Sequence, residues 1–384
     1  MNRRLNVWLS EGLLLLYCLP TTNQIFAPIS ILLKYGQYLG LIWSVLVFFK
    51  LKIFSEKSLW PIWLFVLMML FSTLINGTDI NACINMVYPI FAACVITVHI
   101  MKLRGFQGVE TIAKLFAILL ILQAVSALVG GFGSYVDGNM ITITNYFFRD
   151  RVNFNRIFIY AISLLTLVFL YARRWKWLYI IGGLSGVYFV LYESVSTAIM
   201  AFVVYILVFI VARIIKSEHA WRNMLILLFA IAALFVIAGF SSDGFEWLLV
   251  DFLGEDMTLD GRTLLWAQAI ENMQGWHWIF GNGYGHSFMF WLGTWGVSTA
   301  HSQYMNILFC FGFIGVGAYF FVVYQFLGGL RKEKDERYKR LTVATVAAII
   351  ISGIPTTTYT SVYLYVLYVV FVLPQYRLQN SVKR

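Results

Sequence analysis

Long apolar segments alternate with short polar breaks along almost the whole chain. Many of these segments approach about twenty residues, the length that an α-helix needs to cross the hydrocarbon core of a bilayer. We predict about twelve membrane-spanning helices, at residues 6–22, 28–49, 59–76, 81–99, 110–129, 156–171, 177–192, 195–215, 222–240, 302–328, 340–357 and 361–375. The predicted fold class is an all-α polytopic membrane protein, with residues 1–384 forming a single integral membrane domain.

One polar gap is much longer than the others and separates the ninth predicted span from the tenth. Residues 241–300 contain seven Asp or Glu residues and a single basic residue, Arg262. The stretch "DGRTLLWAQAIENM" (260–273) predicts a short helix, with Asp260 as its N-cap and Gly275 as its stop. The glycines of "GNGYG" (281–285) predict a tight loop. We therefore expect a large loop with short helices.

The distribution of charge orients these spans. Only 12% of the residues are charged and the net charge is +10, yet most of the 28 Lys and Arg residues fall in alternate polar breaks. Loops rich in Lys and Arg face the cytoplasm, so we predict that both termini are cytoplasmic and that the 241–300 loop is extracytoplasmic. Because the cations follow the topology, the basic pI does not indicate a nucleic-acid partner.

Several kinds of chemistry have no sequence signature in this chain. The four cysteines (Cys18, Cys83, Cys94 and Cys310) lie in apolar runs, without the spacing of a disulfide framework or a metal site. The acidic stretch 254–260 matches no calcium loop. There is also no Walker A, HExxH or GxSxG sequence. We predict neither a metal nor another cofactor.

Arginines are prominent among the few cations predicted to face outward. Arg149, Arg151 and Arg156 precede or begin the sixth span, and Arg262 lies in the large loop. A guanidinium presents a planar fork that suits phosphate oxygens. In the first turn of a helix, the free N–H groups and the helix dipole would add to the attraction that Arg262 exerts on an anion. The alternatives are pairing with nearby acids and contact with lipid headgroups.

A histidine marks the point where the large loop returns to the membrane. His301 opens "AHSQYMNILFCFGFIG" (300–315), and an imidazole at that boundary can act as a general base near neutral pH. A polar residue at a membrane interface is the alternative reading. For His277 and His286 we favour structural roles, and Glu193 is a less favoured candidate for a base or a cation ligand.

Taken in order, these stretches resemble one known family. "YESVSTAIMAF" (192–202), "DMTLDGRTLLWAQAIENM" (256–273), "IFGNGYG" (279–285) and "AHSQYMNILFCFGFIG" resemble the signature of the bacterial O-antigen polymerase and O-antigen ligase superfamily. The clear match covers about residues 190–320. The earlier "FFRDRVNFNRIF" (147–158) is similar to the family's Arg- and Asn-containing outer segment. Where the family often has His-Asn at the loop end, this chain has His301-Ser302.

The resemblance implies an enzyme and assigns roles to particular residues. It implies a metal-independent, GT-C-like glycosyltransferase in the bacterial inner (cytoplasmic) membrane, with an extracytoplasmic active site and an undecaprenyl-pyrophosphate-linked oligosaccharide as donor. Its partners would be the lipid bilayer and, in the pathway, a chain-length regulator and a flippase. Arg262 and one of the three earlier arginines would hold the pyrophosphate, and His301 would be the base. The full set of predicted site residues is Arg149, Arg151, Asn155, Arg156, Arg262, Tyr284, His301 and Gln303.

We therefore predict a polymerase of a bacterial surface polysaccharide, with two alternatives. One is a ligase that moves the glycan to another acceptor, which sequence separates poorly from a polymerase. The other is a flippase or transporter of lipid-linked sugar, which predicts ionisable groups inside the spans and related halves. The few mid-span charges and the single dominant loop favour an enzyme.

Overall fold

The structure is a computed structural model. It describes residues 3–19, 28–131, 134–136, 142–144, 146–147, 151–215, 217–237, 262–292, 295–328 and 335–373. The first part of the large loop, residues 238–261, therefore lies outside the described residues, and so does the predicted N-cap Asp260.

Helices make up most of the described chain. The helices are α1 (Arg3–Cys18), α2 (Ser30–Lys50), α3 (Trp60–Ile75), α4 (Ile80–Arg104), α5 (Phe106–Leu128), α6 (Arg151–Tyr171), α7 (Lys176–Tyr192), α8 (Ser196–Val211), α9 (Glu218–Ile237), α10 (Arg262–Glu271), α11 (His277–Phe280), α12 (Gln303–Gly328), α13 (Glu336–Ser352) and α14 (Val362–Val372). Two short 3-10 helices, η2 (Ile53–Ser55) and η3 (Lys57–Leu59), precede α3. Strands β1 (Ser134–Val136) and β2 (Thr142–Thr144) pair antiparallel, and so do β3 (Phe290–Leu292) and β4 (Trp295–Val297).

Each predicted span overlaps one of these helices. Six of the helical segments are long and apolar enough to cross a bilayer: Ser30–Lys50, Lys57–Ile75, Ile80–Arg104, Phe106–Leu128, His219–Val236 and Gln303–Gly328. Five shorter apolar helices, of 10–17 residues, correspond to further predicted spans. The all-α polytopic class is confirmed, whereas the count of twelve spans stays a prediction.

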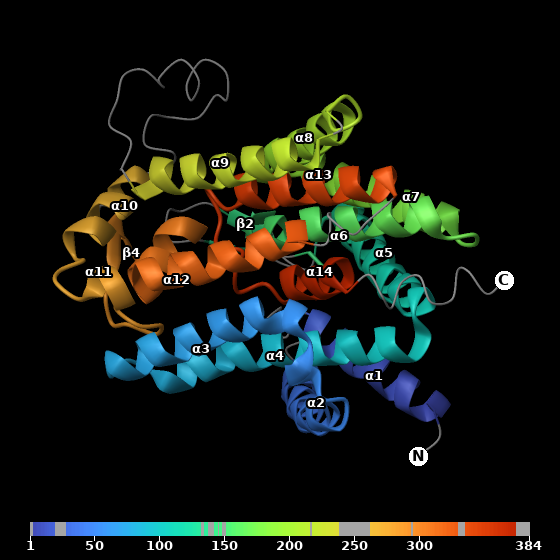
Figure 1. The fold of residues 1–384 in the computed structure, drawn as a ribbon, viewed down its shortest axis with the longest axis horizontal. Helices are drawn as coiled ribbons and strands as arrows, with labels where there is room; N and C mark the ends of the chain where they lie inside the picture. Colours follow the sequence, from blue (N-terminus) through green and yellow to red (C-terminus); the bar gives the residue numbers. More distant parts are fainter. Residues whose placement is uncertain are drawn as a thin grey trace.

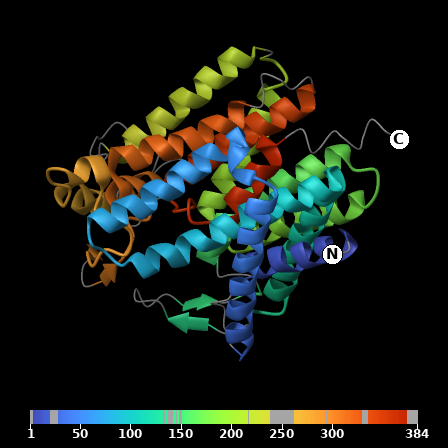
Figure 2. The same ribbon diagram turned by 60° about the horizontal axis from the view of Figure 1, so that its bottom comes forward.

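The helices form a bundle in which segments distant in sequence lie side by side. α12 packs against α3, α13 against α8, and α14 against α4 and α6. Figure 1 shows α10, α11 and β4 gathered at one end of this bundle, beside the start of α12 and the turn between α3 and α4. The same grouping persists in the turned view of Figure 2. Two segments that we predict on one side of the membrane, 76–79 and the large loop, therefore share an end.

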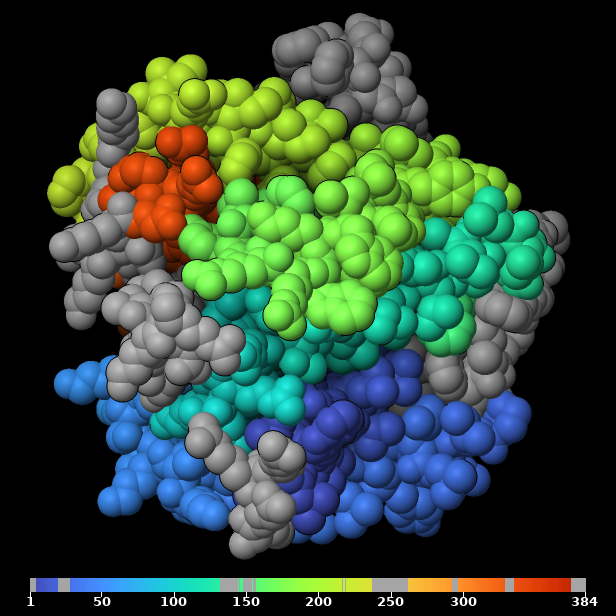
Figure 3. Space-filling model, turned by 90° about the vertical axis from the view of Figure 1, so that its right-hand side faces the viewer, coloured from blue at the N-terminus to red at the C-terminus, as the bar shows by residue number. Residues whose placement is uncertain are grey.

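The opposite end of the bundle carries turns that we predict on the cytoplasmic side. Figure 3 looks at this end, with the green surface of the α7 region in its middle. Lys102, near the end of α4, forms a 2.8 Å ion pair with Glu56, which lies between η2 and η3. The contact joins two segments that the charge pattern places together.

A glycine breaks α12 near its middle. Gly312 has φ 65° and ψ −169°, so the backbone is not helical at this point. A break in a membrane helix frees carbonyl groups that water cannot reach, and each must find a partner inside the protein. The loop 281–285 supplies two: the N–H of Asn282 donates to the carbonyl of Phe309 at 2.7 Å, and that of Gly283 donates to the carbonyl of Cys310 at 2.9 Å.

Helix α3 completes the joint between this loop and the break. The Ser72 hydroxyl contacts the carbonyls of both Phe280 and Cys310, the second at 2.7 Å. Asn76 donates its side-chain amide to the carbonyl of Gly281 at 3.0 Å. The glycines at 281, 283 and 285 have φ of 75°, 80° and 72°, which confirms the predicted tight loop. We call residues 280–285 and 309–312, with Ser72 and Asn76, the glycine joint.

The contact distances at the glycine joint leave no room for a side chain on Gly312. A Cβ atom there would lie 2.2 Å from the carbonyl oxygen of Ile279, and its φ lies in the left-handed region. We expect Gly312→Ala to destabilise the protein by about 2–5 kcal/mol, since left-handed backbone costs about 1–2 kcal/mol and overpacking about 1–3 kcal/mol. The measurement is the thermal unfolding midpoint in detergent. Gly317→Ala is the matched control, because nothing lies within 4 Å of that position on the same helix; equal midpoints for the two variants would contradict the prediction.

Candidate functional site

The predicted anion-binding arginine begins a helix. Arg262 is the first residue of α10, and its side chain is partly exposed. The helix buries Leu265, Trp266 and Ala269, so the first turn and its free N–H groups are held at a fixed place on the bundle. This is the arrangement that suits an anion.

A hydrogen bond ties α10 to the residue before His301. The indole Nε1 of Trp266 donates to the carbonyl of Ala300 at 2.9 Å, and the Trp266 side chain is fully buried. Because Trp266 lies one turn after Arg262 and Ala300 directly precedes His301, the two predicted catalytic residues belong to adjoining segments. His301 is partly buried and has φ 48°, in the left-handed region that a residue with a side chain rarely adopts.

Gln303 lies two residues after His301, and its side chain is fully buried. Its side-chain amide donates to the Tyr319 hydroxyl at 2.5 Å, and its Oε1 atom accepts from the hydroxyl and the N–H of Thr358. Its own N–H donates to the carbonyl of Gly353 at 2.9 Å. The structure therefore places Gln303 as a link to the 353–361 loop between α13 and α14.

The same loop lies close to two other predicted regions. Tyr160 of α6, one turn after Arg156, lies beside Thr358, and Tyr284 lies near Tyr359. In the sequence, "GIPTTTYTS" (353–361) predicts only a break between two spans. The feature that could have indicated a role in the site is the run of hydroxyl side chains in this stretch, between two apolar segments.

The arginines before the sixth span are only partly described. Arg149 lies outside the described residues, and α6 begins at Arg151 and includes Asn155 and Arg156. The part of α6 that lies beside the 353–361 loop is the turn around Tyr160, nine residues after the first residue of the helix.

Tyr284 belongs to the glycine joint as well. Its backbone N–H donates to the Thr73 hydroxyl at 3.1 Å, and its side chain is partly buried. Glu193, between α7 and α8, accepts a hydrogen bond from the hydroxyl of Tyr146. Glu193 is thereby tied to the segment that leads into α6.

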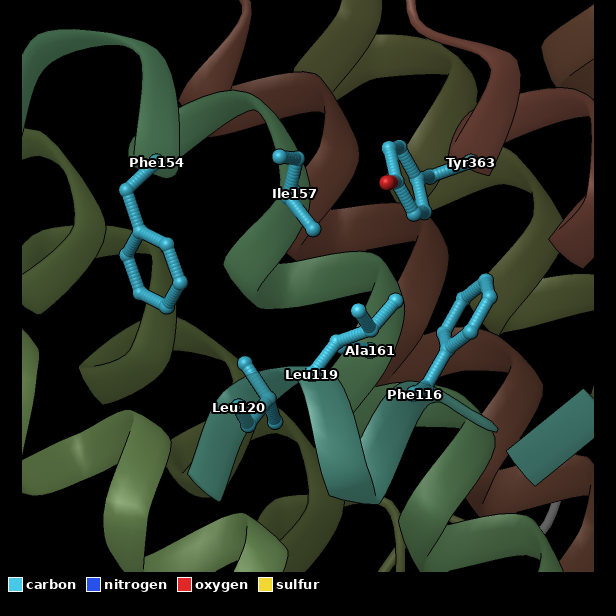
Figure 4. Close-up of a pocket in the computed structure, with 7 residues that line it drawn as sticks. All are labelled: Phe116, Leu119, Leu120, Phe154, Ile157, Ala161 and Tyr363. Atoms are coloured by element: carbon cyan, nitrogen blue, oxygen red, sulfur yellow. The ribbon is translucent and has the colours of Figure 1, made fainter. Parts of the chain in front are cut away.

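A small apolar pocket lies between α5, α6 and α14, as Figure 4 shows. Its lining residues are Phe116, Leu119, Leu120, Phe154, Ile157, Ala161 and Tyr363. None of the predicted site residues lines it, and aliphatic and aromatic walls cannot bind phosphate. Two of its residues, Phe154 and Ile157, flank Asn155 and Arg156 in the sequence of α6.

Within the described ranges, no group of three or more His, Cys, Asp or Glu side chains could hold a metal ion. The four cysteines are buried and free. Burial among apolar side chains suits small core residues rather than ligands.

Comparison with known proteins identifies one part of the chain. Residues 180–320 match the Wzy_C family model, described as O-antigen ligase, over a little more than a third of the chain. The segment runs from within α7 to within α12 and includes Arg262, Tyr284, His301 and Gln303. No curated protein and no solved structure matches the chain significantly.

The match confirms the predicted family relationship. The similarity of residues 180–320 to an O-antigen ligase model supports a relationship to the O-antigen polymerase and ligase superfamily, and the apolar helices fit a multi-pass membrane protein. Members of this superfamily are glycosyltransferase-like enzymes.

The loop histidine next to the glycine joint gives a pH prediction. Burial lowers the pKa of His286, although a 3.2 Å hydrogen bond to the carbonyl of Phe288 opposes this. A lowered folded-state pKa means that the stability from the neutral ring is present above the unfolded pKa of about 6.5 and is lost as pH falls below it. We expect the unfolding midpoint to fall from pH 7.5 to pH 5.5, and His286→Gln to reduce this fall. The exposed His219→Gln is the control, and an unchanged pH dependence in His286→Gln would rule the effect out.

Proposed function

We propose that the protein is a polymerase of a bacterial surface polysaccharide in the cytoplasmic membrane, acting at its extracytoplasmic face. The observation that carries this proposal is the link between α10 and the α12 start, in which Trp266 joins the helix that begins at Arg262 to the residue before His301. The family match supports a glycan transferase of this general kind.

The donor would be an oligosaccharide joined to undecaprenyl pyrophosphate, approaching from the outer leaflet. Arg262 and an arginine near the α6 start (Arg149, Arg151 or Arg156) would bind the pyrophosphate, and Asn155, Tyr284 and Gln303 would contact or support the substrate. A GT-C-like architecture that needs no metal is part of the proposal.

The reaction is a substitution at the anomeric carbon of the donor glycan. A hydroxyl oxygen of the acceptor repeat unit forms the new glycosidic bond while the bond from carbon to the pyrophosphate oxygen breaks. His301 takes the acceptor proton. The arginines stabilise the charge that develops on the departing lipid pyrophosphate. Fixed guanidinium groups in a site of low polarity are more effective than mobile counterions, because they need no reorganisation during the reaction.

A ligase is the second candidate, because the matching family model is described as O-antigen ligase. The two functions differ in the acceptor and not in the donor chemistry. A chain-length regulator and a flippase would act in the same pathway as a polymerase.

The role of Arg262 can be measured with purified protein and lipid-linked repeat units. We expect Arg262→Ala to lower the rate of chain extension by about 10²–10³, the effect of removing one donor that stabilises transition-state charge. Arg262→Lys should recover only part of it, because an ammonium group lacks the planar fork. The control is Arg222→Ala on α9, at the other end of that helix from the large loop. Long lipid-linked chains made by a folded Arg262→Ala protein would refute the phosphate-binding role, and transfer only to a different acceptor would identify a ligase.

The left-handed backbone at His301 allows a clean test of the base. Glycine adopts φ 48° without strain, so we expect His301→Gly to fold. The transfer rate should nevertheless fall by about 10²–10⁴, the usual contribution of a positioned general base. The measurements are the unfolding midpoint and the initial rate of transfer. A stable His301→Gly protein with the natural rate would exclude the imidazole as the base.

A further inference from the structure

The turn that carries His301 is held on both sides by hydrogen bonds. On one side, Ala300 uses both of its backbone groups: its carbonyl accepts from Trp266 and its N–H donates to the Oδ1 atom of Asn306 at 2.9 Å. On the other side, the Gln303 N–H donates to the carbonyl of Gly353 at 2.9 Å. His301 lies between these anchors with a left-handed backbone, a conformation that costs about 1–2 kcal/mol and persists only where its surroundings impose it.

Asn306 connects this turn to a distant part of the chain. Its side chain is 3% exposed, and both ends of its amide are used. The Oδ1 atom accepts from Ala300, and Nδ2 donates to the Thr357 hydroxyl at 2.6 Å. Because the amide is planar, the two bonds together fix where Ala300 lies relative to the 353–361 loop.

We propose that Asn306 and Thr357 are positioning residues that hold the imidazole of His301 in place for proton transfer. The inference rests on the proposed function, in which His301 is the base. If the hydrogen bond between Asn306 and Thr357 is lost, the Asn306 side chain no longer holds Ala300 at a fixed position relative to the 353–361 loop. The strained turn can then relax to another backbone conformation. A displacement of about 1 Å at a reacting group can lower a rate by about 10².

A purely structural role makes different predictions from a positioning role. Loss of a buried hydroxyl anywhere in the bundle lowers stability, but only loss at Thr357 should lower the turnover. Thr342 provides the comparison, because its buried hydroxyl donates to the carbonyl of Tyr338 at 3.0 Å on α13, toward the opposite end of the bundle.

The first experiment compares Thr357→Val, Thr357→Ser and Thr342→Val in the full-length protein. The measured quantities are kcat and KM for the lipid-linked donor and, separately, the thermal unfolding midpoint of each variant. We expect Thr357→Val to lower kcat about 10–100-fold with KM within about twofold, because the reacting group moves while the phosphate contacts stay. Thr357→Ser should restore kcat, and Thr342→Val should leave it unchanged. A natural kcat in a folded Thr357→Val protein, or an equal loss in Thr342→Val, would overturn the proposal.

The second experiment asks whether the effect passes through His301. In a His301→Gly background, Thr357→Val should not lower the residual rate further, since the group that it positions is gone. Asn306→Leu combined with Thr357→Val should be no slower than the slower single variant, because both remove the same link. An equal loss in both backgrounds would show a structural role and overturn the inference alone. A His301→Gly protein with the natural rate would refute the proposed base, and the positioning role with it.

Discussion

The backbone of α12 must find internal hydrogen-bond partners at Gly312, because a bilayer offers none. The carbonyls of Phe309 and Cys310 are satisfied by N–H groups of the 281–285 loop and by the Ser72 hydroxyl. Each side of this contact has a glycine, Gly281 in the loop and Gly312 in α12, because a Cβ atom on either would collide with the opposite backbone. A Cβ at Gly281 would lie 2.2 Å from the backbone of Cys310 and Phe311, so two main chains approach as closely as they can.

This constraint decides where the large loop lies. Once residues 280–285 are fixed on α3 and α12, the preceding α10 and α11 and the following β3 and β4 must remain over the same end of the bundle. Trp266 then reaches Ala300, and the N-terminal turn of α10 lies next to the turn that carries His301. The glycine joint contains neither the proposed base nor a proposed phosphate-binding arginine, yet it determines which groups can meet.

The sequence predicted the parts of this architecture that depend on local patterns. The apolar runs located the long helices, and Arg262, expected in the first turn of a helix, begins α10. That helix ends at Glu271, short of the predicted stop at Gly275, although Gly275 does have a positive φ. The break at Gly312 was missed, since one glycine in an apolar run is compatible with an uninterrupted helix. Only its contact with the main chain near residue 280 makes the break necessary.

The 353–361 loop was missed for a different physical reason. Its hydroxyl groups contact residues about fifty positions earlier in the chain, and no local periodicity encodes such pairing. Gln303 was predicted to touch substrate, and the structure instead surrounds its side chain with Tyr319 and Thr358. That placement is compatible with a supporting part in the site, and direct substrate contact by Gln303 stays a prediction.

The long sequence separation across the glycine joint has a consequence for biosynthesis. Ser72 contacts Phe280 and Cys310, which lie 208 and 238 positions later. During translation, α3 therefore enters the bilayer long before its partners have been made, and its hydroxyl can meanwhile turn back to a carbonyl of its own helix. The contacts at the C-terminal end of α3 are completed only after α12 has been made, so the closure that brings the segments of the proposed site together comes late in biosynthesis.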